Sequence, residues 1–398
     1  MTIGSGKKAY ERPNLVVYGD IREVTKAAGS SAKSDGGQLK QLDKTAYAIG
    51  QSWAAVISIL HGVVSLRGSA YGLQIESNSS IPGLALSTTL APVPDLQVFL
   101  GILPDWLNAA EAQEIRPWRA GADEGEPGQP GLRVWALAGG RFHRLLYPDG
   151  TEFIVDEHGT SIWSWWPDGL SLEDTATYLL GPVMGFVLLR RGIICLHASA
   201  IAVGERAIAI VGPPEAGKST TAAVFAGQAY PVLSDDVVTL DERDGLFLVH
   251  PAYPRIRLWP ESVAALYGSP DALPRLTPTW DKRYLALAEP GYRFQQASLP
   301  LAAIYLLDER GSETVAPRIA DISGRAALMS LLANGYATRW MDRPMRAREF
   351  ELLGRVVASV PVRRAIPHAE VANLPRLCDM ILEDVQALAQ SAERPTQD

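Results

Sequence analysis

The stretch IAIVGPPEAGKSTTAAV, residues 208–224, restricts the fold more than any other part of the sequence. Residues 207–211 form a short, wholly apolar run, as in a strand buried on both faces of a parallel sheet. A helix-forming segment, residues 219–225, follows the turn directly. Between them, the sequence fits G-x-x-x-x-G-K-[ST], the Walker A pattern, at every fixed position. Strand, loop and helix occur in the order that this motif requires, which predicts an α/β core with a phosphate loop.

The turn itself is suited to an anion. Glycines allow successive backbone N–H groups to point into one concavity, and the start of a helix adds partial positive charge. Lys218 would reach the β- and γ-phosphates of a nucleotide, and the Ser219 hydroxyl would bind Mg²⁺. The residues expected to hold the nucleotide are Gly212, Pro213, Pro214, Glu215, Ala216, Gly217, Lys218, Ser219 and Thr220. The alternative is a chance glycine–lysine turn, which leaves the flanking strand and helix unexplained.

Two adjacent carboxylates, Asp235 and Asp236, end a second apolar run in the sequence YPVLSDDVVTL. Open parallel sheets bind ligands at the carboxyl ends of their strands, so we expect this pair near the loop. Successive residues of a strand point to opposite sides, so one carboxylate would hold Mg²⁺ while the other faces the attacking hydroxyl. The alternative is an acidic turn, because Ser-Asp-Asp is also good turn chemistry.

His197 follows an apolar strand and precedes a predicted hairpin at Gly204 and Glu205, which would place it beside the loop. The alternative is a structural histidine. Downstream basic side chains would steady the nucleotide or the transferring phosphoryl group, or else belong to a solvated surface. They are Arg255, Arg257, Lys282 and Arg283. Arg255 and Arg257 are two apart in a predicted strand, so they would share a face.

Together, His197 with the following Ala-Ser, the loop and the acidic pair resemble the bacterial HPr kinase fold in order and approximate spacing, over residues 69–388. The resemblance implies a nucleotide core similar to that of phosphoenolpyruvate carboxykinase, with a β-rich N-terminal domain and C-terminal helices. It also implies ATP and Mg²⁺ as cofactors. Catalytic roles would fall on His197, Lys218, Asp235 and Asp236, the first acid in proton transfer and the second near the metal with Ser219, although their order stays open. No counterpart of the segment for the reverse reaction is found, so we do not expect phosphorolysis or HPr as substrate.

The first 51 residues carry a different pattern. By composition they form a polar, linker-like extension that cannot bury a core, and they lack the apolar centre of a signal peptide. Five positions nevertheless match Y-x-x-P-x-L-x-x-x-G-x-x-x-x-x-T, which resembles the leader of lasso-peptide precursors: Tyr10, Pro13, Leu15, Gly19 and Thr25. Such an extended segment can add a strand to an exposed sheet edge.

The leader resemblance implies two partners, a leader-recognition domain and a leader peptidase that cuts between Lys26 and Ala27. Asp35 would then be the ninth residue and could close an amide ring with the new amino terminus. Lasso gene clusters include HPr-kinase-like enzymes that phosphorylate a serine of the precursor, a ribosomally made peptide. The combined resemblance therefore implies an ATP- and Mg²⁺-dependent serine peptide kinase.

Two other functions stay open: a nucleotide-binding regulatory switch without transfer, and a leader-tagged substrate of maturation enzymes. It also stays open whether the fusion of a leader-like segment to a kinase is natural, how many phosphates are added, and which serine accepts them. Ser30, Ser31 and Ser34 are candidates in cis. HPr kinases assemble into rings, so a homo-oligomer is an alternative to a monomer.

Composition narrows the possible partners of the protein and its compartment. The formal net charge of -7 argues against a general nucleic-acid binder. The stretches WAAVISILHGVVSL and YLLGPVMGFVLL are shorter than a membrane span of ~20 residues, so we expect buried helices and no membrane partner. Cys195 and Cys378 suggest no disulfide framework and fit a reducing cytoplasm.

We expect a leader-like segment with linker over residues 1–51 and a β-rich domain over 52–170. A kinase core over 171–310, a mainly helical part over 311–390 and a disordered tail over 391–398 would follow. Hairpin turns are predicted at 148–150 and 158–159, a helix at 175–190 and a mobile loop at 119–131. Trp163 and Trp165 should share a strand face opposite Trp166 and serve packing.

Overall fold

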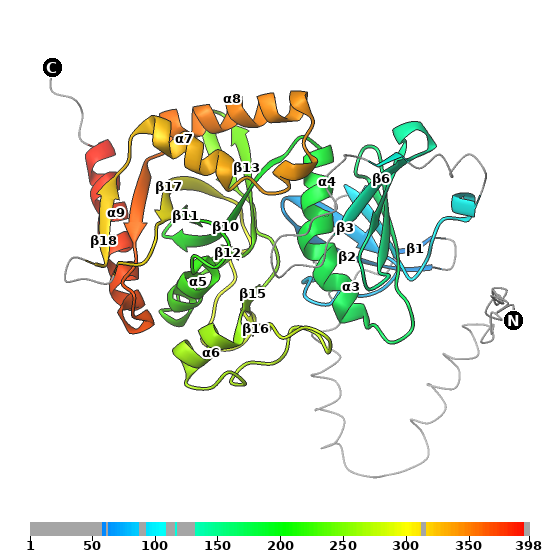
Figure 1. Cartoon of the computed structure of the whole chain (residues 1–398), viewed down its shortest axis with the longest axis horizontal. Coiled ribbons are helices and arrows are strands. Elements are labelled where there is room, and N and C mark those ends of the chain that lie inside the picture. The colour runs from blue at the N-terminus through cyan, green and yellow to red at the C-terminus, as the bar shows by residue number, and fades with distance from the viewer. Residues whose placement is uncertain are drawn as a thin grey trace, which may run out of the picture. The chain divides into compact units, whose positions relative to one another are not determined.

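The computed structural model describes residues 58–60, 63–86, 93–108, 116–117, 132–311 and 316–393. The chain divides into two units, Met1–Trp53 and Ala54–Asp398, and every described residue belongs to the second. The leader-like positions, the predicted cleavage site and the expected mobile loop at 119–131 all lie outside the described residues. The described part is a mixed α/β structure with two large sheets (Figure 1).

The N-terminal sheet is built from short alternating strands. Among the described residues its strand order is β1-β2-β3-β4-β9-β8-β7-β6-β5. The strands are β1 Ser58–Leu60, β2 Val63–Ala70, β3 Leu73–Ser77, β4 Leu96–Leu100, β5 Arg116–Pro117, β6 Arg133–Leu137, β7 Phe142–Leu146, β8 Glu152–Asp156 and β9 Ser161–Trp165. The two predicted hairpins are confirmed, because β7 pairs with β8 and β8 pairs with β9 in antiparallel register. Their turns contain Gly150 at φ 92° and Gly159 at φ 64°, a conformation that favours glycine.

One predicted helix in this region is wrong. The stretch WAAVISILHGVVSL was expected to be a buried helix, but all of its described residues lie in β1 and β2, which pair with each other. The run is rich in valine and isoleucine, whose branched side chains suit a pleated sheet. A short apolar run does not distinguish the two conformations by its periodicity.

The predicted helix at 175–190 is confirmed, with an irregular centre. Helix α3 Leu172–Tyr178 begins at a capping box between Ser171 and Asp174. A single π-turn, Leu179–Val183, contains Pro182, and α4 Met184–Arg190 continues from it. The whole stretch is long and apolar enough to cross a membrane by length and composition, but 83% of its most apolar window is buried inside the protein, as in a core helix. Side chains of the N-terminal sheet and of this helical stretch form one hydrophobic cluster.

The second sheet carries the phosphate loop. Among the described residues its order is β11-β10-β13-β14-β17-β19-β18, with β12 also paired to β10 and β11 also paired to β17. The strands are β10 Ile194–Val203, β11 Arg206–Val211, β12 Val232–Ser234, β13 Val237–Arg243, β14 Leu246–Val249, β17 Leu299–Leu307, β18 Arg318–Asp321 and β19 Val362–Ile366. Strands β11 and β12 both run antiparallel to β10. Their carboxyl ends therefore lie at the same edge of the sheet.

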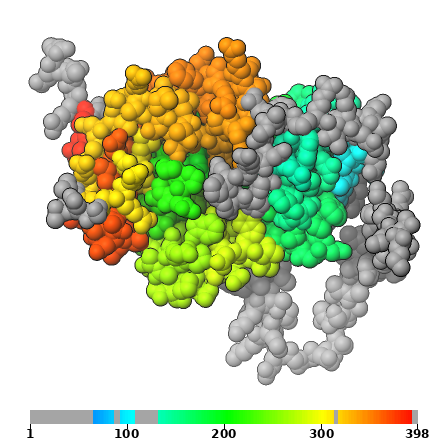
Figure 2. All heavy atoms as spheres, in the orientation of Figure 1, coloured from blue at the N-terminus to red at the C-terminus, as the bar shows by residue number. Residues whose placement is uncertain are grey.

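Helices cover both faces of this sheet. In β11, Ile208 and Ile210 pack in one cluster with residues of α5 Lys218–Gly227 and α9 Leu374–Glu393. Ala209 and Val211 point the other way, toward residues of α7 Gly324–Ala333 and α8 Arg343–Ser359. This explains why the run before the loop is wholly apolar. Figure 2 shows green atoms of the middle of the chain exposed between the yellow and orange C-terminal segments and the yellow-green segment below.

The C-terminal region differs from the expected helical part in two respects. Strands β18 and β19 join the core sheet, where β19 runs parallel to β17. Helix α9 continues to Glu393, three residues into the segment expected to be disordered, while residues 394–398 lie outside the described part. A separate two-stranded ribbon consists of β15 Arg255–Leu258 and β16 Arg283–Ala286. It lies between β14 and β17 in the chain, and α6 Pro260–Tyr267 comes between its two strands.

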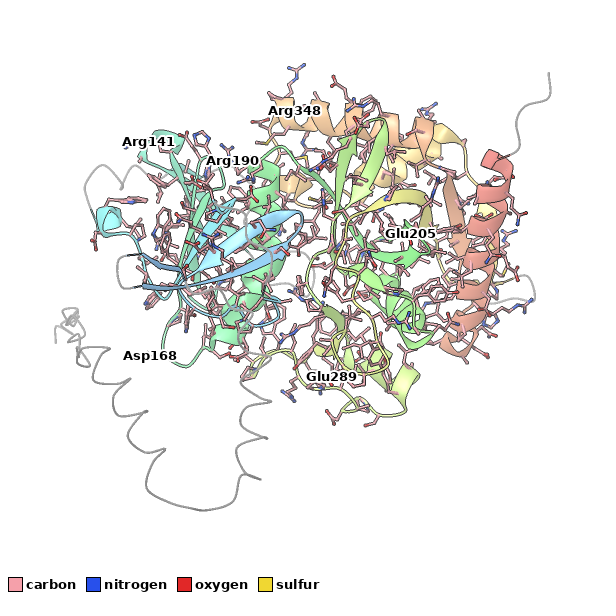
Figure 3. The ribbon with its side chains drawn as sticks, turned by 180° about the vertical axis from the view of Figure 1, so that it is seen from behind. Arg141, Asp168, Arg190, Glu205, Glu289 and Arg348 are labelled. Atoms are coloured by element: carbon pink, nitrogen blue, oxygen red, sulfur yellow. The ribbon has the colours of Figure 1, made fainter. Side chains whose placement is uncertain are left out.

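Of the two tryptophans of β9, Trp163 packs as predicted and Trp165 does not. Trp163 stacks with Phe99 at 5.5 Å between ring centroids and meets Trp106 edge to face, whereas Trp165 is 42% exposed. Trp166 packs against the opposite, core side. Arg190, labelled in Figure 3, ends α4 and donates two hydrogen bonds to the carbonyl oxygen of Glu157 in the turn after β8.

Candidate active site

The phosphate loop connects β11 to α5 and forms a concave backbone. Glu215 at φ 64° and Gly217 at φ 101° are left-handed, and such residues between right-handed neighbours turn N–H groups into one concavity. Gly217 is the N-cap of α5, so the positive end of the helix faces the same space. A side chain at Gly212 would lie 3.1 Å from the Ala216 side chain, so the loop closes tightly there.

Lys218 is buried at 5% exposure, and its ammonium group lies across the loop. Nζ donates to the carbonyl oxygens of Gly212 and Pro213, each at 2.9 Å. Phosphate oxygens accept hydrogen bonds from ammonium groups in the same way, so a bound triphosphate can replace these carbonyls as partners. The Thr220 hydroxyl lies 3.0 Å from that of Ser262 in α6, and not in the loop concavity.

A cavity of about 500 Å³ opens beside the loop, a size typical of small-molecule sites. Its lining residues are Gly212, Pro213, Pro214, Glu215, Ala216, Leu306, Leu307, Asp308, Glu309, Arg310, Ile322, Ser330, Asn334 and Arg364. The wall opposite the loop thus comes from the carboxyl end of β17 and the residues after it. This space can hold the part of a nucleotide that projects from the loop.

Asp235 lies on the loop side of the acidic pair. Its Oδ1 accepts from the Ser199 hydroxyl at 2.7 Å, and its Oδ2 accepts from the backbone N–H of Arg257 at 3.0 Å. Burial raises the pKa of Asp235 above its ordinary value, although these two donors and the nearby Ser219 side chain of the phosphate loop lower it.

Asp236 faces away from Asp235 because its backbone is left-handed, with φ 79°. Its Oδ1 lies 3.2 Å from Nδ1 of His197, and its Oδ2 accepts from the Tyr336 hydroxyl at 3.4 Å. Burial alone would raise the pKa of Asp236. The hydrogen bond and charge of His197, with the charges of Arg257 and Lys282, outweigh burial and hold that pKa far below the usual range.

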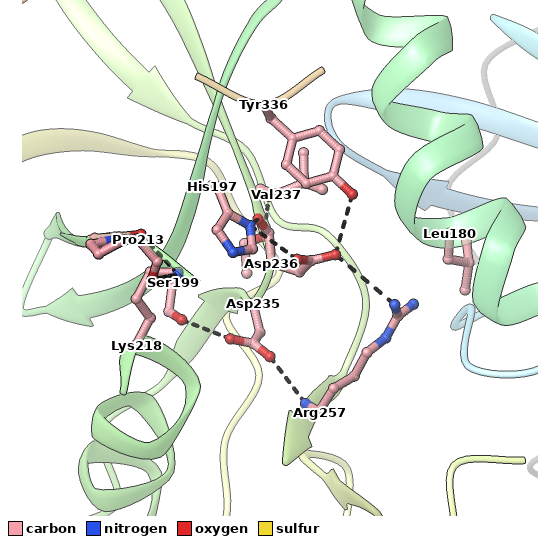
Figure 4. Close-up of polar contacts among 12 residues, drawn as sticks. Leu180, His197, Ser199, Pro213, Lys218, Asp235, Asp236, Val237, Arg257 and Tyr336 are labelled. Carbon is pink, nitrogen blue, oxygen red and sulfur yellow. Dashed lines mark hydrogen bonds and ion pairs between the residues drawn. The ribbon is translucent and has the colours of Figure 1, made fainter. Parts of the chain in front are cut away.

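The divergence of the two carboxylates therefore has a different origin from the one expected. Strand alternation was expected to separate the two side chains, but β12 ends at Ser234 and the pair lies in the turn before β13. Asp235 is the carboxylate near Ser219, whereas the resemblance groups Ser219 with Asp236. Figure 4 shows Pro213 and Lys218 on one side of the acidic pair, and Arg257 and Leu180 on the other.

Arg257 enters the site from β15, as its predicted strand placement allows. Nη2 donates to the carbonyl oxygen of Thr177 at 3.2 Å, and Nη1 lies 4.0 Å from Oδ2 of Asp236. The π-turn brings Gly181 so close that a side chain there would lie 3.2 Å from Nη1 of Arg257. This close approach explains a glycine at the turn, and π-turns inside helices are common at functional sites.

The other three basic residues take separate positions. Lys282 lies over the ring of Trp259 at 4.6 Å and acts electrostatically on both Asp235 and Asp236. Arg255 stacks over Tyr284 at 4.3 Å. Arg283 pairs with Asp271 at 2.7 Å and with Asp281 at 3.5 Å. Its guanidinium therefore holds the segment before β16 in place through these two ion pairs and does not contact the acidic pair.

Three participants had no role assigned to them from the sequence. Ser199 belongs to the Ala-Ser that follows His197, and its place two residues after His197 in β10 puts it on the same strand face. Tyr336 and the Thr177 carbonyl oxygen come from distant segments and carry no local signal. Tyr336 is fixed by its backbone N–H, which donates to the carbonyl oxygen of Cys195 at 2.8 Å.

The oxygen atoms of Ser219 and Asp235 suit Mg²⁺, a hard cation that takes oxygen ligands and is usually completed by phosphates and water. Within the part of the chain that the structure describes, no cluster of three or more His, Cys, Asp or Glu side chains could hold a metal ion alone. A magnesium ion at this place would thus be held jointly by the protein and the nucleotide.

No protein-family model and no curated protein matches the sequence. Among solved structures, the chain is similar to the Hpr(Ser) kinase/phosphatase from Coxiella burnetii. The identity is 15% and the TM-score is 0.25, over 50% of this chain and 98% of that one.

Proposed function

We propose that this protein is an ATP- and Mg²⁺-dependent kinase that transfers the γ-phosphoryl group to a serine of a lasso-type precursor peptide. One observation supports it above all: the acidic pair divides between the phosphate loop and a histidine. Asp235 lies near Ser219 of the loop and its pKa is influenced by that side chain, while Asp236 contacts His197. A phosphotransferase needs both functions, a metal beside the phosphates and a group that takes the proton of the acceptor.

The roles follow from the positions. The backbone of the loop and Lys218 would bind the phosphates and stabilise charge in transfer. Mg²⁺, held with Ser219 and Asp235, would supply charge neutralisation between the phosphates. His197, oriented by Asp236, would accept the proton of the serine hydroxyl through Nε2. Figure 4 shows the second ring nitrogen of His197 directed to the side of Pro213 and Lys218.

The peptide class rests on the leader-like pattern at Tyr10, Pro13, Leu15, Gly19 and Thr25. A chain that carries such a pattern and a phosphotransfer site is suited to act on a lasso-type precursor, with a leader-recognition domain and a leader peptidase as further partners. Cys195 and Cys378 are both free and buried, in keeping with our proposal of a cytoplasmic protein.

The test is phosphate transfer from labelled ATP with Mg²⁺ to a synthetic peptide of residues 27–40, which contains Ser30, Ser31 and Ser34. We expect label on the peptide with the native chain and none with Lys218→Ala. Arg243→Ala removes an exposed cation paired with Asp241 and should retain full transfer. Binding of ATP that leaves label on neither the peptide nor the chain would contradict the kinase and favour a nucleotide-dependent switch.

A further inference from the structure

Arg257 has hydrogen-bonding capacity that its neighbours do not use. The side chain is only 10% exposed. Among the described residues, its Nε–H has no hydrogen-bond partner, and the 4.0 Å ion pair with Asp236 is too long for a hydrogen bond. Buried donors are nearly always paired, so this guanidinium is prepared for an additional acceptor.

Lys282 is a second cation that acts on the same carboxylates. Burial lowers its pKa, the charge of Asp236 raises it, that of Arg257 lowers it and that of Asp235 raises it. Asp235 already accepts from the Ser199 hydroxyl and from the backbone N–H of Arg257, and Asp236 contacts His197. Among the described residues, neither the Arg257 guanidinium nor the Lys282 ammonium thus has a carboxylate within hydrogen-bonding distance of its own. A buried cation without such a partner is costly, and an anionic ligand group would supply one.

These two cations lie on the acceptor side of the site. Lys218 and Pro213 lie on one side of the acidic pair and Arg257 on the other (Figure 4). Arg257 and Lys282 belong to the β15–β16 ribbon and the segment leading into it, and not to the phosphate loop. The triphosphate has its own cation in Lys218, so the group that meets Arg257 enters with the acceptor.

We propose that Arg257 and Lys282 bind a carboxylate that flanks the acceptor serine, so that the substrate is an acidic peptide. This specificity rests on the proposed function, since it concerns the acceptor of that reaction. An arginine fork accommodates a carboxylate with two parallel hydrogen bonds, and a nearby ammonium adds a point charge. The sequence of residues 27–40 provides an internal comparison: Asp35 follows Ser34, whereas Ser30 and Ser31 have no acidic neighbour.

The experiment uses the peptide of residues 27–40 and its Asp35→Asn variant, each with a free or an amidated C-terminus. With the native chain, we expect transfer to Ser34 and a KM about tenfold or more higher when the recognised carboxylate is removed, with little change in kcat. An effect of Asp35→Asn identifies a side-chain carboxylate, and an effect of amidation identifies a terminal one. Equal KM values for all four peptides would overturn the inference.

Matched enzyme variants separate recognition from general damage. In Arg257→Lys and Lys282→Met, removal of the peptide carboxylate should no longer change KM appreciably, because the partner is already lost. Arg243→Gln, an exposed cation elsewhere, should retain the full tenfold effect. Persistence of that effect in both site variants would refute recognition by these residues.

Peptide binding, measured separately from phosphate transfer, distinguishes failure of the kinase proposal from failure of carboxylate recognition. Fluorescence anisotropy of the labelled peptides reports affinity whether or not phosphate is transferred. If no peptide is phosphorylated, the kinase proposal fails, and the affinities alone decide this inference. Weaker binding of the carboxylate-free peptide that disappears in Arg257→Lys supports it, and equal affinities overturn it.

Discussion

Nδ1 of His197 lies 3.2 Å from Oδ1 of Asp236 and 3.2 Å from the backbone carbonyl oxygen of the same residue. Both neighbours are acceptors, so the proton of a neutral ring resides on Nδ1, and Nε2 is left as an acceptor. Asp236 is held in its ionised form by His197, Arg257 and Lys282 against the effect of burial. The arrangement orients the ring and stabilises the positive charge that it would gain from a proton.

Replacement of His197 by Gln should therefore lower kcat about 10²- to 10⁴-fold, the usual contribution of a general base. Asp236→Asn should act in the same direction, because the ring loses its charged partner. Affinity for Mg-ATP, measured by calorimetric titration, should change little in both variants, since neither residue is part of the phosphate loop. Native turnover in His197→Gln would exclude it as the proton acceptor.

Asp235→Asn should affect a different quantity. Its carboxylate lies near the Ser219 side chain of the phosphate loop, so we expect it to support the metal and not the proton transfer. The Mg²⁺-dependent part of ATP affinity should fall about 10- to 100-fold, as when metal-supporting groups are lost. ATP affinity in the presence of EDTA should be unchanged. If turnover falls while the Mg²⁺ dependence stays native, Asp235 is instead the base.

Gly185 in α4 sets the position of Tyr336. A side chain at Gly185 would lie 2.3 Å from Cε1 of Tyr336, whose backbone is fixed by Cys195. Gly185→Ala should lower the free energy of unfolding by about 1–3 kcal/mol through overpacking and move the Tyr336 hydroxyl from Asp236. Thermal unfolding measures the first effect and kcat the second.

Gly354 in α8 provides the matched control for that substitution. Nothing lies within 4 Å of a side chain built there, so Gly354→Ala should raise stability by about 0.5–1 kcal/mol through helix propensity. Equal effects of the two substitutions would show that Tyr336 moves aside at no cost.

Local patterns predicted the parts of this structure whose causes are local. The strand, loop and helix at 206–227 follow from one apolar run, one glycine-rich turn and one helical segment. The contact of His197 with Asp236 joins β10 to the turn after β12, and strand order brings these segments together. Contacts between residues that are adjacent in a sheet but distant in the chain produce no local sequence pattern from which they could be predicted.

Long-range packing accounts for what could not be predicted. Tyr336 reaches Asp236 from a loop 100 residues away, and that position depends on how α7 covers the sheet. The left-handed backbone of Asp236 is also set by its surroundings, because Asp adopts that region only rarely. Strand β19 was missed because its run, Val362–Ile366, contains two arginines and resembles no buried strand.

Protonation of His143 should lower the stability of the protein at low pH. His143 in β7 is fully buried and meets the ring of Phe186 in α4 edge to face at 5.3 Å. Burial lowers the pKa of His143 from 6.5 to about 4, and the charge of Arg190 adds to this. Above pH 6.5 neither the folded nor the unfolded chain is protonated here. Below pH 6.5, His143 binds a proton in the unfolded chain but stays neutral in the folded chain, so about 3 kcal/mol of stability is lost by pH 4.

Melting temperatures between pH 7 and 4.5 should therefore fall less steeply for His143→Gln than for the native chain. His158→Gln, at an exposed side chain, should keep the native slope. Parallel curves for the native chain and His143→Gln would mean that His143 is protonated in the folded state.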